Sequence, residues 1–214
     1  AAAGVEISAI LDARAASADA APQGVRVVHG ASVHATKGKH RISGVIADRG
    51  GLDELIACDA LAMSGGWSPI IPLACQRGAK PVWSDEKQAF MAPIVGGELE
   101  IAGSAAGIES VSGCLADGAE KARLVVESLG RVAHASDLPE VEGEYDPSFA
   151  AIWHVPGAKD KAFVDFQNDV HAKDLGLALR EGFGHVEHAK RYTTSGMATD
   201  QGKLGNVNAA GIIA

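Results

Sequence analysis

The fold is decided at Leu99-Glu100-Ile101-Ala102-Gly103-Ser104-Ala105-Ala106-Gly107, a run that stands just before a long helical pattern. Its first four residues predict a short strand, and the two bounding glycines predict a tight turn. In residues 111–129, apolar side chains recur at the spacing of one helix face. Strand, glycine-rich turn and helix in this order are typical of a nucleotide-binding α/β fold.

The turn also has the chemistry of a phosphate site. Glycines let the backbone approach a phosphate closely, and the amide groups at a helix start attract its negative charge. Gly103 to Gly107 meets this need, and Gly65-Gly66 meets it less fully. Neither run is a GxGxxG fingerprint, so each is equally well a tight strand-to-helix turn that holds no ligand.

The residues before this turn continue the α/β pattern. Residues 25–28 and 42–46 predict strands that flank a hairpin turn at 36–39, where a glycine supplies the unusual backbone angles. Residues 55–63 predict a buried strand that runs into Ser64-Gly65-Gly66. We therefore expect residues 1–130 to form part of a Rossmann-like dinucleotide-binding region.

The opening strand offers a second, weaker cofactor signal. It ends at Asp12, where a dinucleotide fold places a carboxylate that binds a ribose hydroxyl. Because Arg14 follows closely, the same pair equally suits the start of a solvated loop.

Two further regions follow. Residues 131–161 carry interleaved acidic residues, prolines and glycines, a composition that cannot bury itself and predicts a linker. Residues 162–214 return to helical spacing through Leu175, Leu179 and Phe183, and predict a small, mostly helical module.

Composition excludes some classes of function. The net charge of −8 over 214 residues argues against a nucleic-acid surface, and no apolar run is long enough to span a membrane. Three widely spaced cysteines form neither a disulfide framework nor a metal motif, which favours a reducing, cytoplasmic location. Because both ends lie in apolar segments without an initiator Met, we expect an internal piece of a longer chain.

Catalytic and metal-binding machinery is not visible. His185 and His188 are three residues apart on a predicted helix, but a third ligand is not obvious and Lys190 and Arg191 stand beside them. Metal sites normally need at least three protein ligands, so a solvated helix face is the favoured interpretation. Nucleophile elbows, P-loops and Ser-His-Asp arrangements are missing from the sequence.

Several longer runs resemble the alpha subunits of heterotetrameric sarcosine oxidases. The runs are residues 58–69 (CDALAMSGGWSP), 163–170 (FVDFQNDV) and, most specifically, 186–203 (VEHAKRYTTSGMATDQGK). They stand in the family's order and cover most of the chain.

The resemblance implies an oxidoreductase that demethylates sarcosine to glycine, releases hydrogen peroxide and passes a one-carbon unit to tetrahydrofolate. It implies beta, gamma and delta partner subunits and four cofactor sites. NAD is bound in alpha, FMN lies at the alpha–beta interface, FAD is in beta, and folate is in a C-terminal alpha domain outside this chain. The isolated segment is expected to be inactive and to bind NAD weakly or not at all.

The resemblance also carries the site residues. In similar flavin disulfide reductases the turn after the last strand is Gly-Asp, whereas here it is Gly103-Ser104, which suits a nucleotide other than FAD. The implied NAD-binding residues are Gly65, Gly66, Gly103, Ser104, Ala105, Glu109 and Val111.

The last module resembles small [2Fe-2S] modules whose ligands are cysteines. The matching positions hold Asp165, Gln167, Asp200 and Gly205, and clusters need thiolates, so we expect a retained scaffold without its metal. An alternative function is a structural or electron-transfer adaptor of an opine-type dehydrogenase complex, which cysteines at these positions would have favoured.

Overall fold

The computed structural model describes residues 4–17, 19, 21–93, 99–134, 137–158 and 160–214. Contacts divide the chain into two units. The first contains Ala1–Ala16, Ala21–Met63 and Ala150–Ala214, and the second contains Ser17–Ala20 and Ser64–Phe149. The acidic segment 131–161 contributes to both, and its described residues form neither helix nor strand.

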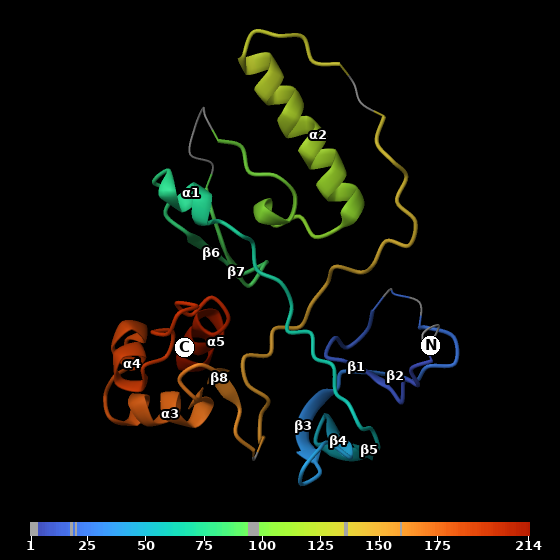
Figure 1. The fold of residues 1–214 in the computed structure, drawn as a ribbon, viewed down its shortest axis with the longest axis vertical. Coiled ribbons are helices and arrows are strands. Elements are labelled where there is room, and N and C mark those ends of the chain that lie inside the picture. The colour runs from blue at the N-terminus through green and yellow to red at the C-terminus, as the bar shows by residue number, and fades with distance from the viewer. Residues whose placement is uncertain (1–3, 18, 20, 94–98, 135–136, 159) are drawn as a thin grey trace. The chain divides into compact units, whose positions relative to one another are not determined.

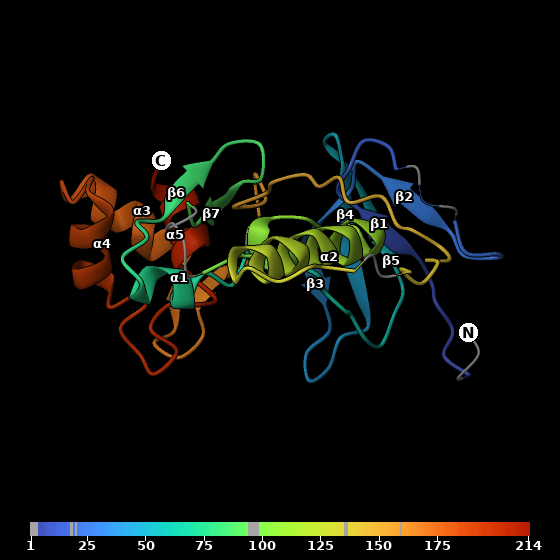
Figure 2. The same ribbon diagram turned by 90° about the horizontal axis from the view of Figure 1, so that it is seen from above.

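The N-terminal part of the first unit is built from two small sheets (Figure 1). In the first sheet, β1 (Ile10–Asp12) pairs in parallel with β2 (Val27–His29). The second sheet is an antiparallel meander of β3 (Ser32–Lys37), β4 (Gly44–Arg49) and β5 (Leu52–Ile56), which lie side by side in both Figures 1 and 2.

The hairpin predicted around residues 36–39 is confirmed, but its first strand is β3 and not residues 25–28. Gly38 makes the turn with φ of +123°, and a Cβ there would lie 1.9 Å from the carbonyl oxygen of Arg41, so only glycine fits. Residues 27–29 instead form β2 and pair with β1. The reason is topological: the parallel neighbour is distant in sequence, and periodicity alone does not identify it.

The predicted buried strand at residues 55–63 is wrong beyond Ile56. Strand β5 ends at Ile56, and Leu55 and Met63 are 63% and 73% exposed. Ile56 is buried in the core with Val45 and Ala47 of β4, and the partly exposed Cys58 and Leu61 pack against that core. Past Ile56 the run therefore continues without strand pairing.

The module at residues 162–214 combines a short hairpin with three helices. The hairpin pairs β8 (Phe163–Asp165) with β9 (Val170–His171), and the helices are α3 (Ala172–Arg180), α4 (Val186–Thr193) and α5 (Asn206–Ile213). These elements cluster in both views (Figures 1 and 2). Their core is Val164, Leu175 and Ala209, all with less than 10% of their surface exposed.

The second unit contains the glycine-rich turn from Gly103 to Gly107. It consists of α1 (Pro72–Gln76), the antiparallel pair β6 (Val82–Ser84) and β7 (Ala89–Met91), the 3-10 turn η1 (Gly103–Ala106) and α2 (Val111–Ser128). Helix α2 confirms the predicted helix to within one residue. The predicted strand at residues 99–102 is wrong, because these residues have no strand partner; only Ala102, which precedes η1, is shown with an extended backbone.

Helices and strands are thus mixed, as an α/β fold requires. In the part of the chain that the structure describes, the sheets have two or three strands, and β1–β2 is the parallel pair. None of the helices in these residues has the length and apolarity needed to cross a bilayer.

Candidate functional site

The glycines at either end of η1 both have a positive φ, a backbone conformation that favours glycine. Gly107 has a φ of +79°, and a Cβ on it would lie 2.6 Å from the methyl carbon of Met91. Gly103 has a φ of +62°, and its amide donates a hydrogen bond of 2.8 Å to Asp117 of α2. The turn is therefore pinned both to β7 and to the helix that follows it.

The first backbone amides of α2 are arranged to bind an anion, but side chains of the same chain already accept their hydrogen bonds. The N-cap Ser110 accepts a hydrogen bond of 3.1 Å from the Gly113 amide, and Glu144 accepts one of 2.7 Å from the Ser112 amide. Hydrogen bonding from Ser112 lowers the pKa of Glu144 below its usual value. A carboxylate oxygen thus stands where a phosphate oxygen would bind a helix start.

A tyrosine holds this acidic segment beside the turn. The Tyr145 hydroxyl donates to the backbone carbonyl of Glu109, next to the cap at Ser110. Glu144 and Tyr145 belong to the segment predicted to be a linker, and neither contact is predicted from the sequence. Each joins residues more than thirty positions apart, so no local spacing signals it.

The predicted NAD-binding residues fall into two groups. Gly103, Ser104 and Ala105 form η1, Glu109 precedes the cap, and Val111 opens α2. Of these, Ser104 and Val111 are exposed. Gly65 and Gly66 instead lie in an exposed stretch without helix or strand between β5 and α1, and a Cβ on either would meet open space.

The second cofactor signal, Asp12, is engaged locally. Its carboxylate accepts hydrogen bonds from the backbone amide and the guanidinium of Arg14, the shortest of them 2.7 Å. Hydrogen bonding to the Arg14 side chain outweighs burial and lowers the pKa of Asp12. The pair therefore forms the start of a loop, which is the second of the two interpretations given for Asp12 and Arg14.

Two of the four positions that resemble cluster ligands tie the module together through hydrogen bonds. Asp165 is 6% exposed, and its carboxylate accepts hydrogen bonds from the amides of Gln167 (2.8 Å), Asn168 (3.0 Å) and Gly196 (2.7 Å). Burial raises the pKa of Asp165, but these amide hydrogen bonds outweigh it and the net shift is downward. The Gln167 side chain accepts a hydrogen bond of 2.8 Å from Thr199.

The other two positions shape the loop that leads into α5. Asp200 accepts the Gly202 amide at 3.2 Å. Gly205 lies against β8, where a Cβ would come within 2.4 Å of the Val164 carbonyl oxygen. All four positions therefore have structural roles in this fold. Among the residues that the structure describes, no group of three or more His, Cys, Asp or Glu side chains is placed to hold a metal ion.

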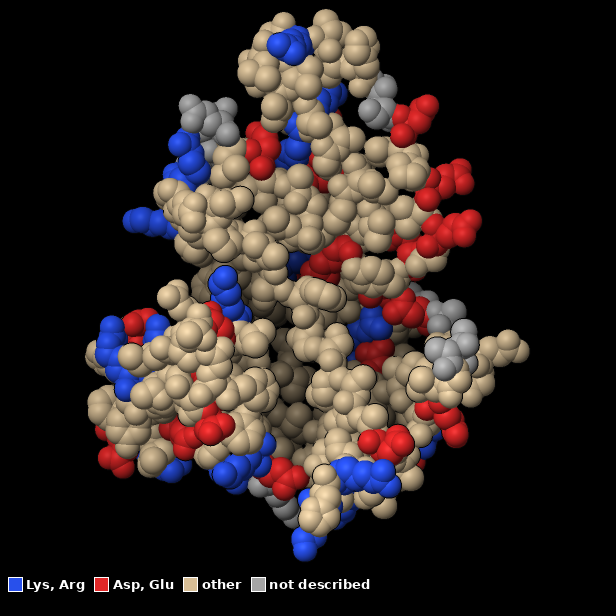
Figure 3. All heavy atoms as spheres, in the orientation of Figure 1, with Lys and Arg blue, Asp and Glu red and all other residues tan. Residues whose placement is uncertain are grey.

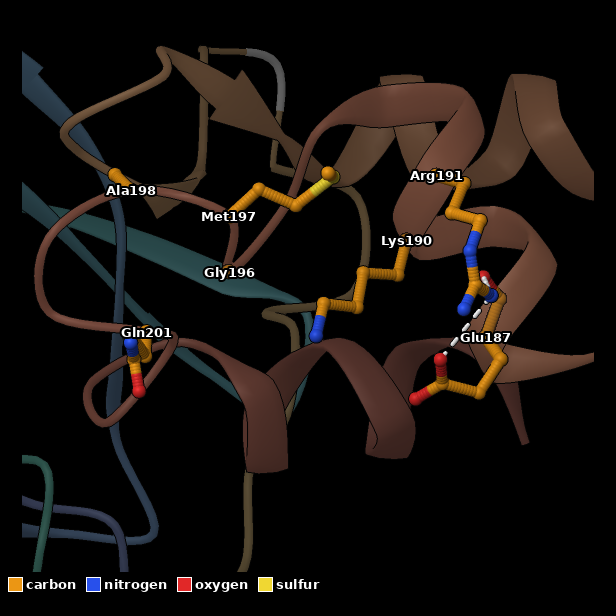
Figure 4. Close-up of a pocket in the computed structure, with 7 residues that line it drawn as sticks. All are labelled: Glu187, Lys190, Arg191, Gly196, Met197, Ala198 and Gln201. Carbon is orange, nitrogen blue, oxygen red and sulfur yellow. Dashed lines mark hydrogen bonds and ion pairs between the residues drawn. The ribbon is translucent and has the colours of Figure 1, made fainter.

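A pocket opens on the same module, between α4 and the loop at residues 196–201 (Figure 4). Arg191 on its wall is paired with Glu187 at 3.1 Å. The Lys190 side chain extends into the space between helix and loop, and Met197 is 57% exposed at its rim. The pocket thus combines a cation with an apolar edge.

Residues 159–214 match the family model of the sarcosine oxidase A3 domain. The whole chain is 55% identical to the sarcosine oxidase subunit alpha of Rhizobium meliloti (strain 1021), of which it covers 22%. It is 34% identical over 230 residues to the corresponding subunit of Corynebacterium sp. (strain P-1), with 97% of this chain and 23% of that protein covered. Along its full length, the chain matches a segment of sarcosine oxidase alpha subunits.

The alpha subunits are several times longer than this chain, which spans about a fifth of their length. The fold also resembles a solved structure, the L-proline dehydrogenase from P. horikoshii. The TM-score is 0.62 at 22% identity, with 89% of this chain and 40% of that chain covered. At this identity the likeness concerns the fold alone.

Proposed function

We propose that the chain is a scaffold segment of a sarcosine oxidase alpha subunit, within an enzyme that oxidises sarcosine to glycine. The observation that carries the proposal is the 55% identity to such a subunit over all 214 residues. The activity, and the beta, gamma and delta partners, belong to the whole complex. FMN, FAD and tetrahydrofolate are proposed for that complex and not for this segment alone.

Within this role, NAD contacts the turn from Gly103 to Val111, with Gly65 and Gly66 as further backbone contacts. The Ser112 amide supports this placement, because it already binds a carboxylate oxygen at 2.7 Å and is therefore oriented to receive an oxyanion. When a nucleotide phosphate takes that position, Glu144 must leave it. The acidic segment and the nucleotide thus compete for one helix start.

This competition predicts that Glu144→Gln strengthens NAD binding by the intact alpha subunit about two- to fivefold, since the variant removes a competing negative charge from the helix start. Titration calorimetry measures the affinity. Glu142→Gln is the matched control, because Glu142 is exposed in the same acidic segment (Figure 3, red spheres along residues 137–146). Equal affinities in the two variants would place the nucleotide elsewhere, and no NAD binding by the wild type would remove the site altogether.

We also propose that the segment contacts the flavin or the beta subunit in the complex. The pocket beside α4 supports this contact. Lys190 supplies a point charge and three donors to an anionic or polar group, and the exposed Met197 supplies an apolar edge. Arg191, already paired with Glu187, fixes the wall of the pocket.

Lys190→Ala is therefore expected to lower the FMN content of the complex, or to weaken alpha–beta association, by about three- to tenfold, because a charge-assisted contact is lost. Flavin absorbance and sedimentation of the reconstituted complex measure the two quantities. Lys161→Ala, at an exposed position just before the same module, is the control and should change neither. Retained FMN and an intact complex in Lys190→Ala would leave the loop with only a structural role.

A further inference from the structure

One imidazole ring joins two parts of the first unit that are distant in sequence. His34 lies on β3, and 19% of its side chain is exposed. Its Nδ1 atom is 3.0 Å from a carboxylate oxygen of Asp53 on β5. Its Nε2 atom is 2.6 Å from the backbone carbonyl oxygen of Gly157, 123 residues later in the sequence. The ring thus links the β3–β4–β5 sheet to residues 150–158, which we call the connecting segment.

Both partners of the ring accept hydrogen bonds, because one is a carboxylate oxygen and the other a carbonyl oxygen. A neutral imidazole carries a proton on only one of its nitrogens, whereas the protonated ring donates from both. Both contacts of His34 are therefore hydrogen bonds only when the ring is an imidazolium ion. The hydrogen bond to Asp53, followed by the one to Gly157, raises the pKa of His34 above its usual value.

The charges that act on this ring are negative. Asp53 of β5 contacts it, and the charge of Asp48 on β4 acts in the same direction. Glu54, the other carboxylate of β5, is paired with Arg26 at 2.5 Å. These surroundings favour the protonated ring. The remaining ionisable side chains of the sheet and the connecting segment are Lys37 on β3, Arg49 on β4 and His154 in the segment.

The connecting segment presents Gly157 to the ring in a tight turn. Gly157 has a φ of +72°, and the Ala158 amide closes the turn by donating a hydrogen bond of 3.2 Å to the Val155 carbonyl. A Cβ on Gly157 would lie 3.5 Å from the Nε2 atom of His34, so the ring and the turn are in direct contact. His34 therefore holds a closed turn, and the Ala158 amide reports whether that turn stays formed.

The same segment contacts the 162–214 module through Trp153. A Cβ on Gly211 of α5 would come within 2.4 Å of the Trp153 ring, so the ring lies directly on the helix. Apolar packing thus fixes the segment to the module, and His34 fixes it to the sheet. Of these two attachments, the one through the imidazole ring depends on a proton.

We propose that protonated His34 is a pH-sensitive clasp that holds the connecting segment against the β3–β4–β5 sheet and opens when the ring loses its proton. A neutral ring keeps one of its two contacts and turns a nitrogen lone pair toward the other acceptor. Because the pKa of His34 is raised when the clasp is closed, the clasp is complete below the ordinary histidine value of about 6.5. It is lost as the pH rises through the raised value. The proposal rests on none of the proposed cofactor sites.

Amide hydrogen exchange of the intact alpha subunit, read by peptide mass spectrometry, tests the clasp. It follows the Val155–Ala158 turn at about pH 6 and about pH 9, on either side of the titration of a histidine. His34→Gln removes the titrating ring, and its single amide nitrogen cannot occupy the positions of both ring nitrogens. His40→Gln, at an exposed position between β3 and β4, is the matched control. Each variant is compared with the wild type at the same pH, so the intrinsic pH dependence of exchange cancels.

At about pH 6 the turn is expected to exchange about three- to tenfold faster in His34→Gln than in the wild type, and at about pH 9 the two should match. His40→Gln should match the wild type at both values. Equal exchange of His34→Gln and the wild type at about pH 6 would overturn the proposal. So would an equal difference at both pH values, because His34 would then hold the turn without titrating.

Asp53→Asn keeps the proposal testable if His34→Gln does not fold, since the Asp53 side chain is 56% exposed. This variant removes the largest cause of the raised pKa of His34. The pH at which the turn loosens should therefore move downward, toward the ordinary histidine value. An unchanged transition would contradict the proposal. Because the exchange of this turn reports neither NAD nor flavin, the result is separate from the tests of the proposed function.

Discussion

Asp165→Asn is expected to destabilise the 162–214 module by about 2 kcal/mol, the value of hydrogen bonds to a charged group. The Asp165 carboxylate is buried and receives three backbone amides, of which Gly196 lies 31 residues away in sequence. An Asn side chain has one acceptor oxygen in place of two, so the Gly196 amide loses its partner. Asp165→Ala strands all three amides and should cost more.

Native-state hydrogen exchange of amides in α3 and α5 measures this loss as a local opening free energy. Asp169→Asn is the control, because Asp169 is exposed in the same loop and its φ of +54° is a conformation that Asn adopts readily. If Asp165→Asn and the control exchange at the same rate, the carboxylate does not hold the two loops together.

The same carboxylate predicts how the module responds to acid. Since its pKa is lowered in the folded state, Asp165 stabilises the module above the unfolded-state pKa of about 3.9. That contribution is lost as the pH falls through the lower, folded-state value. Between about pH 6 and about pH 3 the wild type should therefore lose more stability than Asp165→Asn. Parallel losses in the two proteins would show that other groups govern the acid response.

Gly205→Ala is expected to destabilise the module by about 2–3 kcal/mol, the cost of overpacking a close contact. A Cβ at this position would stand 2.4 Å from the carbonyl oxygen and 3.3 Å from the carbonyl carbon of Val164. Both are backbone atoms of β8, so no side-chain rotation relieves the clash. The start of α5 must then move away from the hairpin, which opens the core at Val164, Leu175 and Ala209.

Gly184→Ala is the matched control, since it lies in the same module, has no positive φ, and places its Cβ in open space. It should change stability by less than about 0.5 kcal/mol. Thermal unfolding followed by near-ultraviolet circular dichroism compares the two variants. A wild-type transition in Gly205→Ala would refute the packing argument. Gly205→Cys meets the same clash, so restoring a thiol there would not by itself rebuild a cluster site.

Local features were predictable because neighbouring residues determine them. The helical spacing from Val111 onward predicted α2, and the glycine in the turn at residues 36–39 predicted the hairpin. The strand predicted at residues 55–63 was wrong past Ile56, and the strand predicted at residues 99–102 was wrong throughout. Both predictions failed because a strand also needs a hydrogen-bonded neighbour. An apolar run contains no information about that neighbour.

What the sequence determined by itself is therefore the local chemistry: the helix α2, the turn at Gly38, and the lack of cysteines at the four cluster-like positions. Only the tertiary structure decided what those positions do instead. Asp165 reaches Gly196 across 31 residues, and Glu144 reaches the α2 start at Ser112 across 32. Such contacts depend on how the whole chain closes its loops, and a loop of this length can close in many ways that the residues inside it do not distinguish.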